Sequence, residues 1–122
     1  MMEYQAVDLR HKLSLFSDHW APKIIGKLNN YYLKVVKVAG HFTWHRHDET
    51  DEVFIVIKGN LRIDFRDGSV NLREGQLFIV EKGKEHKPYA ENECEILLFE
   101  PDTTLNTGNI RDEFTKEKLE WI

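Results

Sequence analysis

The sequence predicts an all-β protein that folds as a sandwich or a barrel. Between residues 29 and 101, short apolar or alternating segments recur about every ten residues, and turn-forming residues separate them. No helical pattern interrupts this series. Because 122 residues is the size of one domain, we expect a single domain over 1–122, with a barrel at about 31–101, an N-terminal arm at 1–30 and a C-terminal tail at 102–122.

The first three predicted strands differ in their apolar pattern. Residues 31–38 are rich in aromatic and β-branched side chains. Residues 53–57 are continuously apolar, which favours a strand covered on both faces, and the turn residues 59–60 follow. Residues 61–66 alternate between apolar and charged, which indicates a half-buried strand, and Asp67-Gly68 is a hairpin signal.

Three more strands complete the predicted sheet. Val70 and Leu72 continue the alternation before the turn residues Glu74-Gly75. Residues 77–80 and 94–99 are mainly apolar, so we expect two further buried strands there.

The ends are expected to add short helical extensions to the barrel. Asp8 can cap a helix in which Leu9, Leu13 and Phe16 share one face. Residues 112–119 are expected to form a short charged helix. The chain finishes with the apolar pair 121–122, which we expect to dock onto the barrel or onto a partner subunit.

The composition is that of an ordinary globular protein, with 41% hydrophobic and 31% charged residues. A formal net charge of −4 and the absence of a Lys/Arg cluster predict no nucleic-acid partner. No apolar stretch approaches the ~18 residues that span a bilayer, so we expect no membrane partner. Cys94 is the only cysteine and adjoins apolar residues, which indicates a buried structural thiol. One thiol and no signal-peptide pattern favour a cytoplasmic location.

His45, His47 and Glu52 form the most informative pattern in the sequence. On a strand, residues i and i+2 point to the same side, so His45 and His47 present both imidazole rings to one face. The acidic turn 48–51 follows, and Glu52 opens the next strand, where its carboxylate can approach the two rings. Two imidazoles and a carboxylate on one face are good ligands for a transition metal.

A second stretch supplies a further histidine. Gly75 precedes the apolar segment 77–80, Gly83 lies in the next turn, and His86 follows three residues later. This order would bring His86 to a strand beside the first pair of histidines.

These two stretches resemble the paired motifs of the cupin superfamily. The first motif, a His-x-His pair followed by a glutamate and a glycine, is matched by His45, His47, Glu52 and Gly59. Gly40 precedes the pair by one residue fewer than is usual.

The second cupin motif is matched by Gly75, Gly83 and His86. Glu81 stands where the family has a proline, and Ala90 stands where an asparagine often follows. Neither position is a metal ligand, so both departures concern the stiffness of the loop.

The resemblance covers about residues 31–99 and implies a six-stranded double-stranded β-helix, the jelly-roll barrel. It implies that the metal is held inside one end by four protein ligands, His45, His47, Glu52 and His86. This donor set suits one divalent transition metal, Mn, Fe, Co, Ni or Zn. Within the superfamily, the chain is most similar to the small single-domain cupins of the mannose-6-phosphate isomerase-like type.

Function does not follow from this fold alone, because one scaffold hosts many chemistries. The first hypothesis is a metal-dependent enzyme of the dioxygenase, isomerase, decarboxylase or lyase type that acts on a small polar oxygen-bearing metabolite. No residue is marked as the catalytic base, and Glu85, Lys87 and Tyr89 are candidates. The alternative is a non-catalytic small-molecule-binding or carrier module, and a third hypothesis is a metal-stabilised structural or storage protein.

Some aromatic and loop residues allow two interpretations. Trp44, Phe54, Phe78 and Tyr89 could line a pocket beside the metal, but we expect most of them in the core. Segment 103–108 could reach the barrel mouth, but we expect a simple loop.

Other potential ligands are expected to stay outside the site. Glu49 and Asp51 could compete with Glu52 for the metal, but we expect a solvated loop. We interpret the other three histidines, His11, His19 and His41, as ordinary polar residues.

Small cupins are often homodimers, and the resemblance therefore implies a second copy as a partner. Trp20, Ile24 and Ile25 precede the barrel, and Trp121 and Ile122 follow it. These five residues are the candidates for the interface.

Overall fold

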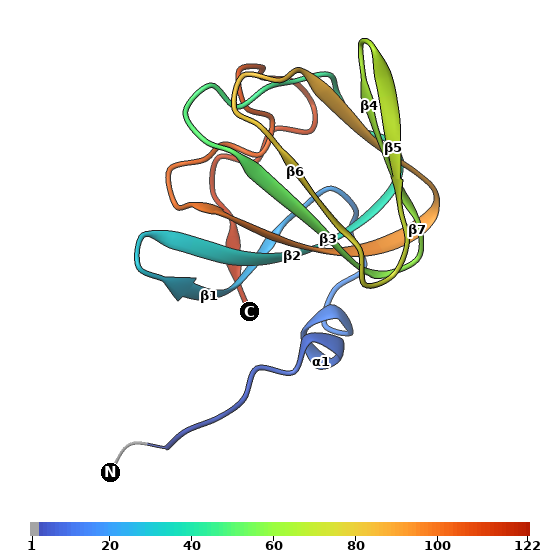
Figure 1. Cartoon of the computed structure of the whole chain (residues 1–122). Coiled ribbons are helices and arrows are strands. Elements are labelled where there is room, and N and C mark those ends of the chain that lie inside the picture. The colour runs from blue at the N-terminus through green and yellow to red at the C-terminus, as the bar shows by residue number, and fades with distance from the viewer. Residues whose placement is uncertain (1–2) are drawn as a thin grey trace.

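Strands dominate the computed structural model, which describes residues 3–122 (Figure 1). The elements are α1 Leu9–Leu13, β1 Lys23–Leu28, β2 Tyr31–His41, β3 Glu52–Lys58, β4 Leu61–Phe65, β5 Gly68–Leu72, β6 Leu77–Val80, β7 His86–Pro101 and β8 Glu120–Trp121. One sheet runs in the order β5-β4-β7-β2-β1-β8, and β3 pairs with both β6 and β7. This arrangement confirms the predicted jelly-roll barrel.

The 16-residue strand β7 connects the two halves of the barrel. Its first residues, 86–89, pair with β4, and its last residues, 95–99, pair with β3. Strand β2 runs beside it along almost its whole length. The predicted strand 94–99 is therefore only the second half of a longer strand, and His86 begins that same strand.

Alternate side chains of β2, β3 and β7 point into the barrel and form its core. The residues that these strands contribute to the core cluster are Val36, Val38, Phe54, Val56, Ala90, Cys94, Ile96 and Leu98. The turn after β3 depends on a glycine, because Gly59 has φ +91° and a Cβ there would lie 3.1 Å from the Glu93 carbonyl oxygen. Burial raises the pKa of the Cys94 thiol to about 12, which agrees with the predicted structural role.

The outer surface of the sheet has two different halves. On β4, Arg62 and Asp64 point outward and pair with each other, the usual polar exterior of an antiparallel sheet. Over β6, β3 and the end of β7 the exterior is apolar. The prediction that 77–80 is a buried strand is wrong for one face, since Leu77 and Ile79 are 56% and 54% exposed.

The N-terminal helix is confirmed as α1. The Asp8 carboxylate accepts hydrogen bonds from the backbone N–H groups of Arg10 and His11, and Leu13 is buried. Strand β1 lies within the predicted arm 1–30 and pairs with β2. Residues 1–2 of that arm lie outside the described residues.

The predicted C-terminal helix is wrong, because residues 112–119 form turns and bends. Side chains satisfy three backbone N–H groups here, and one of them, the Lys116 N–H, would be paired internally in a helix over 112–119. Asp112 accepts from the Phe114 N–H, Thr115 accepts from the Asp112 N–H, and Asn106 accepts from the Lys116 N–H. Such local side-chain bonds compete with helix formation.

The C-terminal end docks onto the barrel, one of the two alternatives in the sequence prediction. Strand β8 pairs in parallel with β1, and the Ile122 N–H donates to the Ile24 carbonyl oxygen at 3.0 Å. The Trp121 ring meets the Tyr32 ring edge-on, with centroids 5.5 Å apart. Within residues 3–122, no helix combines the length and the apolar content needed to cross a bilayer.

Candidate metal centre

His45 and His47 lie in the connection between β2 and β3. They were expected on a regular strand, but only one isolated bridge forms there, between His45 and His86. The His45 N–H donates to the His86 carbonyl oxygen at 3.0 Å, and the His86 N–H donates back at 2.8 Å. The His47 carbonyl oxygen accepts from the Gly83 N–H at 2.7 Å. These bonds hold the irregular segment against the start of β7.

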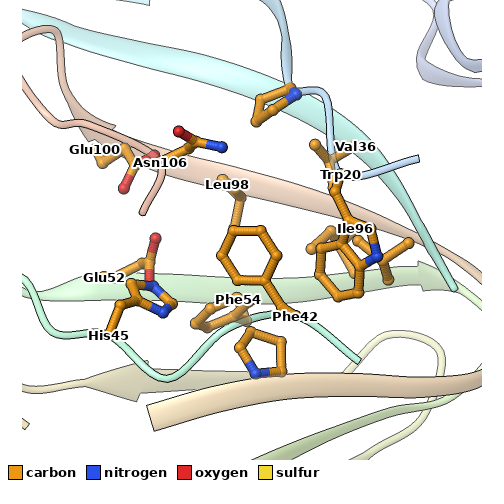
Figure 2. A pocket seen from close by; sticks show the side chains of 13 residues that line it. Trp20, Val36, Phe42, His45, Glu52, Phe54, Ile96, Leu98, Glu100 and Asn106 are labelled. Carbon is orange, nitrogen blue, oxygen red and sulfur yellow. The ribbon is translucent and has the colours of Figure 1, made fainter. Parts of the chain in front are cut away.

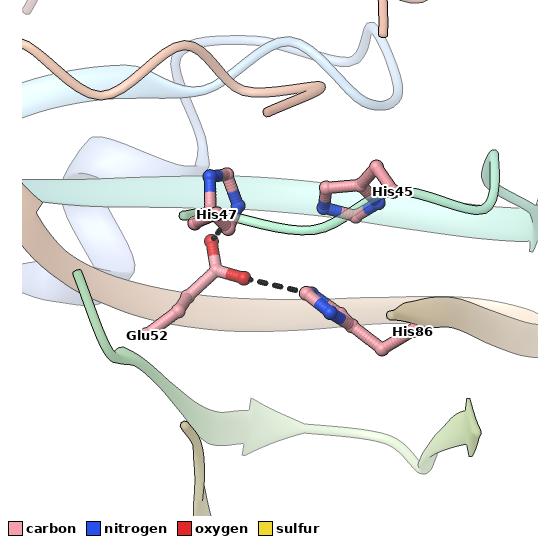
Figure 3. Close-up of side chains that lie close together, drawn as sticks. All are labelled: His45, His47, Glu52 and His86. Carbon is pink, nitrogen blue, oxygen red and sulfur yellow. Dashed lines mark hydrogen bonds and ion pairs between the residues drawn. The ribbon is translucent and has the colours of Figure 1, made fainter. Parts of the chain in front are cut away.

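The structure brings together all four predicted ligand residues (Figure 3). One potential ligand atom from each of His45, His47, Glu52 and His86 lies within 4.8 Å of the others. All four residues are buried, and none is more than 6% exposed. Glu52 opens β3 as predicted, and His86 opens β7. The cluster therefore could hold one metal ion.

The Glu52 carboxylate lies between two of the rings. Its Oε1 is 3.1 Å from His86 Nε2, and its Oε2 is 3.3 Å from His47 Nε2 (Figure 3). Despite the short second distance, His47 Nε2 is buried and makes no hydrogen bond of acceptable geometry. Burying a ring nitrogen without a hydrogen-bond partner lowers the stability of the fold. A cation bound by both this nitrogen and the Glu52 carboxylate would supply the missing partner.

Backbone carbonyl groups fix the orientation of two rings. His45 Nδ1 lies 3.0 Å from the Thr43 carbonyl oxygen, and His86 Nδ1 lies 2.8 Å from the Lys84 carbonyl oxygen. A carbonyl oxygen only accepts, so each Nδ1 carries the proton and the neutral ring turns the Nε2 lone pair toward the cluster. In neutral His86 that lone pair faces a carboxylate oxygen. A proton or a metal ion between them removes the repulsion, and this tautomer is the usual one for metal-bound histidine.

The pKa shifts favour the protonation states that metal ligands need at His45 and Glu52, but not at His47. Burial and then the neighbouring His86 lower the pKa of His45 to about 4. Burial would raise the pKa of Glu52, but His47 and His86 outweigh it and hold this pKa well below its usual range. Burial also opposes protonation of His47, but Glu52 raises its pKa. In the metal-free cluster, His47 thus holds a proton more readily than His45 does.

The loop after β7 closes the barrel end beside His47. Gly108 has φ +57°, and a Cβ there would overlap the Arg46 carbonyl oxygen and lie 3.2 Å from His47 Nδ1. Thr107 is fully buried and Asn106 lines the inner cavity. The expectation of a simple loop at 103–108 is therefore wrong, since the segment packs against His47 of the four-residue cluster.

An apolar cavity adjoins the cluster inside the barrel (Figure 2). Its apolar walls include Trp20, Phe42, Phe54 and Ile96, and its polar residues are His45, Glu52, Glu100 and Asn106. Of the aromatic residues considered from the sequence, Phe54 lines this cavity, Phe78 packs against the core, and Trp44 and Tyr89 contact Arg66 and Arg62.

Sequence reasoning missed a buried ion pair between Lys34 and Glu100. Both side chains are 1% exposed, and Lys34 Nζ lies 3.0 Å from Glu100 Oε1. Burial and then Glu52 raise the pKa of Glu100 to about 8, against the effect of Lys34. The signal was present, because each charge occupies an inward position of an otherwise apolar strand.

The three candidate bases lie away from the cluster. Glu85 pairs with Arg66 at 2.7 Å, and Lys87 lies 3.4 Å from Asp64. Tyr89 stacks against His41, with centroids 4.3 Å apart. All three side chains belong to the exterior, so none is positioned as a base for a ligand in the barrel.

The remaining polar residues are placed as expected. Glu49 and Asp51 are exposed and outside the cluster, and Asp51 accepts from the Lys82 N–H. The other three histidines, His11, His19 and His41, are not part of the cluster either.

Comparisons with known proteins agree with this fold. The family model described as "Cupin domain" matches residues 32–100, more than half of the chain. A cupin-2 domain containing protein from Shewanella frigidimarina is 48% identical, covers 78% of this chain and 93% of its own, and superimposes with a TM-score of 0.77. A Neisseria meningitidis protein is 32% identical, covers 80% of this chain and 100% of its own, and has a TM-score of 0.73.

Two further similarities are more limited. The uncharacterized protein YdbB of Bacillus subtilis is 33% identical over 64 residues, which are 52% of this chain and 57% of that protein. Hydroquinone 1,2-dioxygenase in complex with Cd²⁺ and 4-hydroxybenzonitrile is 17% identical, with a TM-score of 0.65 over 84% of this chain and 80% of its own. At this identity the likeness shows the fold alone.

Proposed function

The chain belongs to the cupin family, and from this premise we propose that it binds one divalent transition metal ion and uses the ion to bind and transform a small oxygen-bearing molecule. The four ligands would be His45, His47, Glu52 and His86. When bound, such an ion supplies Lewis-acid chemistry, or oxygen chemistry if it is iron. Three imidazoles and one carboxylate suit Mn, Fe, Co, Ni or Zn.

One observation carries this proposal. The Nδ1 atoms of His45 and His86 are both satisfied by backbone carbonyl oxygens, so both Nε2 lone pairs are directed into the cluster that contains the buried Glu52 carboxylate. An arrangement of lone pairs around a negative charge is unstable without a cation. Residues that only filled a core would not be arranged in this way.

A non-catalytic binding or carrier module is the second candidate. It is favoured by the outward placement of Glu85, Lys87 and Tyr89, because these side chains cannot exchange protons with a molecule inside the barrel. Turnover separates the two candidates, whereas metal binding is common to both.

Elemental analysis of purified protein tests the proposal. We expect about one equivalent of transition metal per chain, and we expect His45→Ala and His47→Ala to lose it. His19→Ala is the matched control, because His19 pairs with Glu93 on the surface at 2.9 Å. Full retention of metal in both site variants would refute the assignment. The metal found in native-source protein would identify the working ion.

We also propose that the protein is a homodimer in the cytoplasm, but that its interface differs from the one expected from the sequence. Trp20 and Ile24 are 9% and 3% exposed within one chain, so their side chains belong to its own core. The apolar exterior of β6, β3 and β7 is the better candidate. There Ile79, Val53 and Phe99 form one row and Leu77, Ile55 and Leu97 form the next.

Pairing with a second copy would explain this surface. An antiparallel sheet with one face in water normally alternates between apolar and polar residues, as β4 does. Over β6, β3 and the end of β7 both faces are apolar, and a flat apolar face can pair with itself about a twofold axis. The mannose-6-phosphate isomerase-like subtype stays a prediction as well.

A further inference from the structure

The Lys34–Glu100 pair places two charges inside the barrel. Both side chains are on the inner faces of adjacent strands, β2 and β7, whose other inward residues are mainly apolar, and Glu52 and His47 lie nearby. Removing two charges from water costs more than their attraction usually returns, and apolar pairs of similar volume are often as stable or more stable. A buried pair in such a place therefore needs a reason other than stability.

One atom of the pair is left without a partner. Lys34 Nζ contacts Oε1 of Glu100, but Glu100 Oε2 is buried and makes no hydrogen bond with any described residue. The neighbouring Asn106 amide makes its hydrogen bonds elsewhere, since its Nδ2 donates to the Phe114 carbonyl oxygen and its Oδ1 accepts from the Lys116 N–H. Glu100 thus presents one free carboxyl oxygen inside the barrel.

That carboxyl group lies on the wall of the cavity that adjoins the metal cluster. Figure 2 shows Glu100 and Glu52 at one side of the cavity, Trp20 and Ile96 at the other side, and Phe42 between them. The cavity therefore has a polar end, which includes one metal-ligand carboxylate and one free carboxyl group, and an apolar end.

We infer that Glu100, positioned by Lys34, is the residue that recognises the ligand, by a hydrogen bond between its free carboxyl oxygen and a hydroxyl group of a small molecule with an apolar body. This inference rests on the proposed function. A hydroxyl group both donates and accepts, so it pairs with either form of the carboxyl group. The apolar body would occupy the end of the cavity formed by Trp20, Phe42 and Ile96.

This assignment narrows the class of molecule. A polyanion or a large sugar phosphate would place charge against apolar walls and beside Glu52 and Glu100, which is unfavourable. A small alcohol, phenol or enol has one group for Glu100, an apolar remainder for the walls, and an oxygen within reach of the metal cluster.

Phenol and toluene are suitable probes, because they share one apolar ring and differ in the hydroxyl group. Their dissociation constants are measured by calorimetry for the wild type and for the double variant Lys34→Met/Glu100→Leu, both metal-free and with Ni²⁺. We expect the preference for phenol over toluene to fall by about tenfold to a hundredfold in the double variant, the range for one hydrogen bond to a charged group. We expect this fall with and without nickel.

A control variant lies on the same two strands. Lys37 and Glu95 are 3.9 Å apart and face outward, so Lys37→Met/Glu95→Leu removes the same residue types without touching the cavity. It should leave the phenol preference unchanged. The melting temperature of Lys34→Met/Glu100→Leu should equal or exceed that of the wild type.

The outcomes separate this inference from the proposed function. An unchanged phenol preference in the double variant overturns the inference, because it would mean that the free Glu100 oxygen meets only water. A large loss of stability in the double variant also overturns it, because the pair would then be structural. Failure of the proposed function would show instead as a wild-type protein that takes up no nickel, and the metal-free measurements would still decide the role of Glu100.

Discussion

His47 Nε2 and Glu52 Oε2 lie 3.3 Å apart in a buried site, yet they form no hydrogen bond of acceptable geometry. The distance suits attraction between opposite charges, and the misalignment leaves the ring nitrogen free for another partner. The first prediction is that metal ions fill this role and stabilise the fold. Adding Ni²⁺ or Zn²⁺ at about a hundred times the dissociation constant should stabilise the protein by about 3 kcal/mol.

The melting temperature with and without metal measures this effect. Wild type should melt at a higher temperature with metal, whereas His47→Ala and His86→Ala should not respond. Because the imidazoles must be deprotonated to bind, the shift should decrease below about pH 6. Equal shifts in the two variants and the wild type would contradict a metal site at this cluster.

A second prediction concerns pH and the metal-free protein. Folding lowers the pKa of His45 from 6.5 to about 4, so below pH 6.5 the unfolded chain binds more protons than the folded one. Stability should therefore fall as the pH falls from 6.5 toward 4, by about 3 kcal/mol from this group. Urea unfolding of wild type and His45→Gln at pH 7 and 4.5 measures it.

The variant should lose less stability than the wild type over the same pH range. His47 and Glu52 also contribute to the pH dependence of stability, with opposite signs and in different pH ranges. His47, whose pKa is raised, stabilises the fold below its unfolded pKa, and this contribution is lost as the pH rises through the folded value. Glu52, whose pKa is lowered, stabilises above its unfolded pKa, and this contribution is lost as the pH falls through the folded value. Parallel pH profiles for wild type and His45→Gln would count against the assignment to His45.

Gly108 gives a third prediction. A Cβ at this position would overlap the Arg46 carbonyl oxygen and crowd His47 Nδ1, and φ is positive. Gly108→Ala should therefore displace His47 and weaken metal binding at least tenfold, with a loss of stability of about 1–3 kcal/mol. Gly68→Ala is the control, because a Cβ at Gly68 meets nothing within 4 Å. Metal titration of both variants tests this prediction. Equal metal affinities would mean that close packing of Gly108 does not fix the position of His47.

Truncation of the C-terminal end is the fourth prediction. Removing residues 119–122 deletes β8, its pairing with β1 and the contact between Trp121 and Tyr32. The melting temperature should fall by about 5 °C, which corresponds to roughly 1–2 kcal/mol. A truncated protein that melts at the wild-type temperature would mean that the docked strand contributes nothing.

The fifth prediction concerns the homodimer. Leu77→Lys/Ile79→Lys places charges on the apolar exterior of β6, where both side chains are more than half exposed in one chain. Sedimentation should show a dimer for the wild type at micromolar concentration and a monomer for this variant. Ser69→Lys/Asn71→Lys, on the edge strand β5, should remain dimeric. A monomeric wild type would refute the proposal.

Strands β2 to β7, the α1 cap and the identity of the four clustered residues could be predicted from the sequence, whereas β1 and β8 were not expected. Alternation and turn residues depend on local geometry, so they are readable without the fold. The spacing of His45, His47 and Glu52 is likewise a local pattern that can be read without the fold. The family resemblance added His86 to this set. The C-terminal helix failed because Asn106 Oδ1 accepts from the Lys116 N–H, a group that a helix over 112–119 would have paired internally.

The residues that surround the cluster could not be predicted, because they are brought there by contacts between distant parts of the chain. Lys34 and Glu100 are 66 positions apart, and their pairing follows from the register between β2 and β7, which no local pattern specifies. No local pattern specifies the contact between Gly108 and the Arg46 carbonyl group either. Nor does a local pattern show that Leu77 and Ile79 lie on an exposed face. A strand pattern tells which side chains share a face, but the closure of the barrel determines which face meets the metal cluster, the cavity or water.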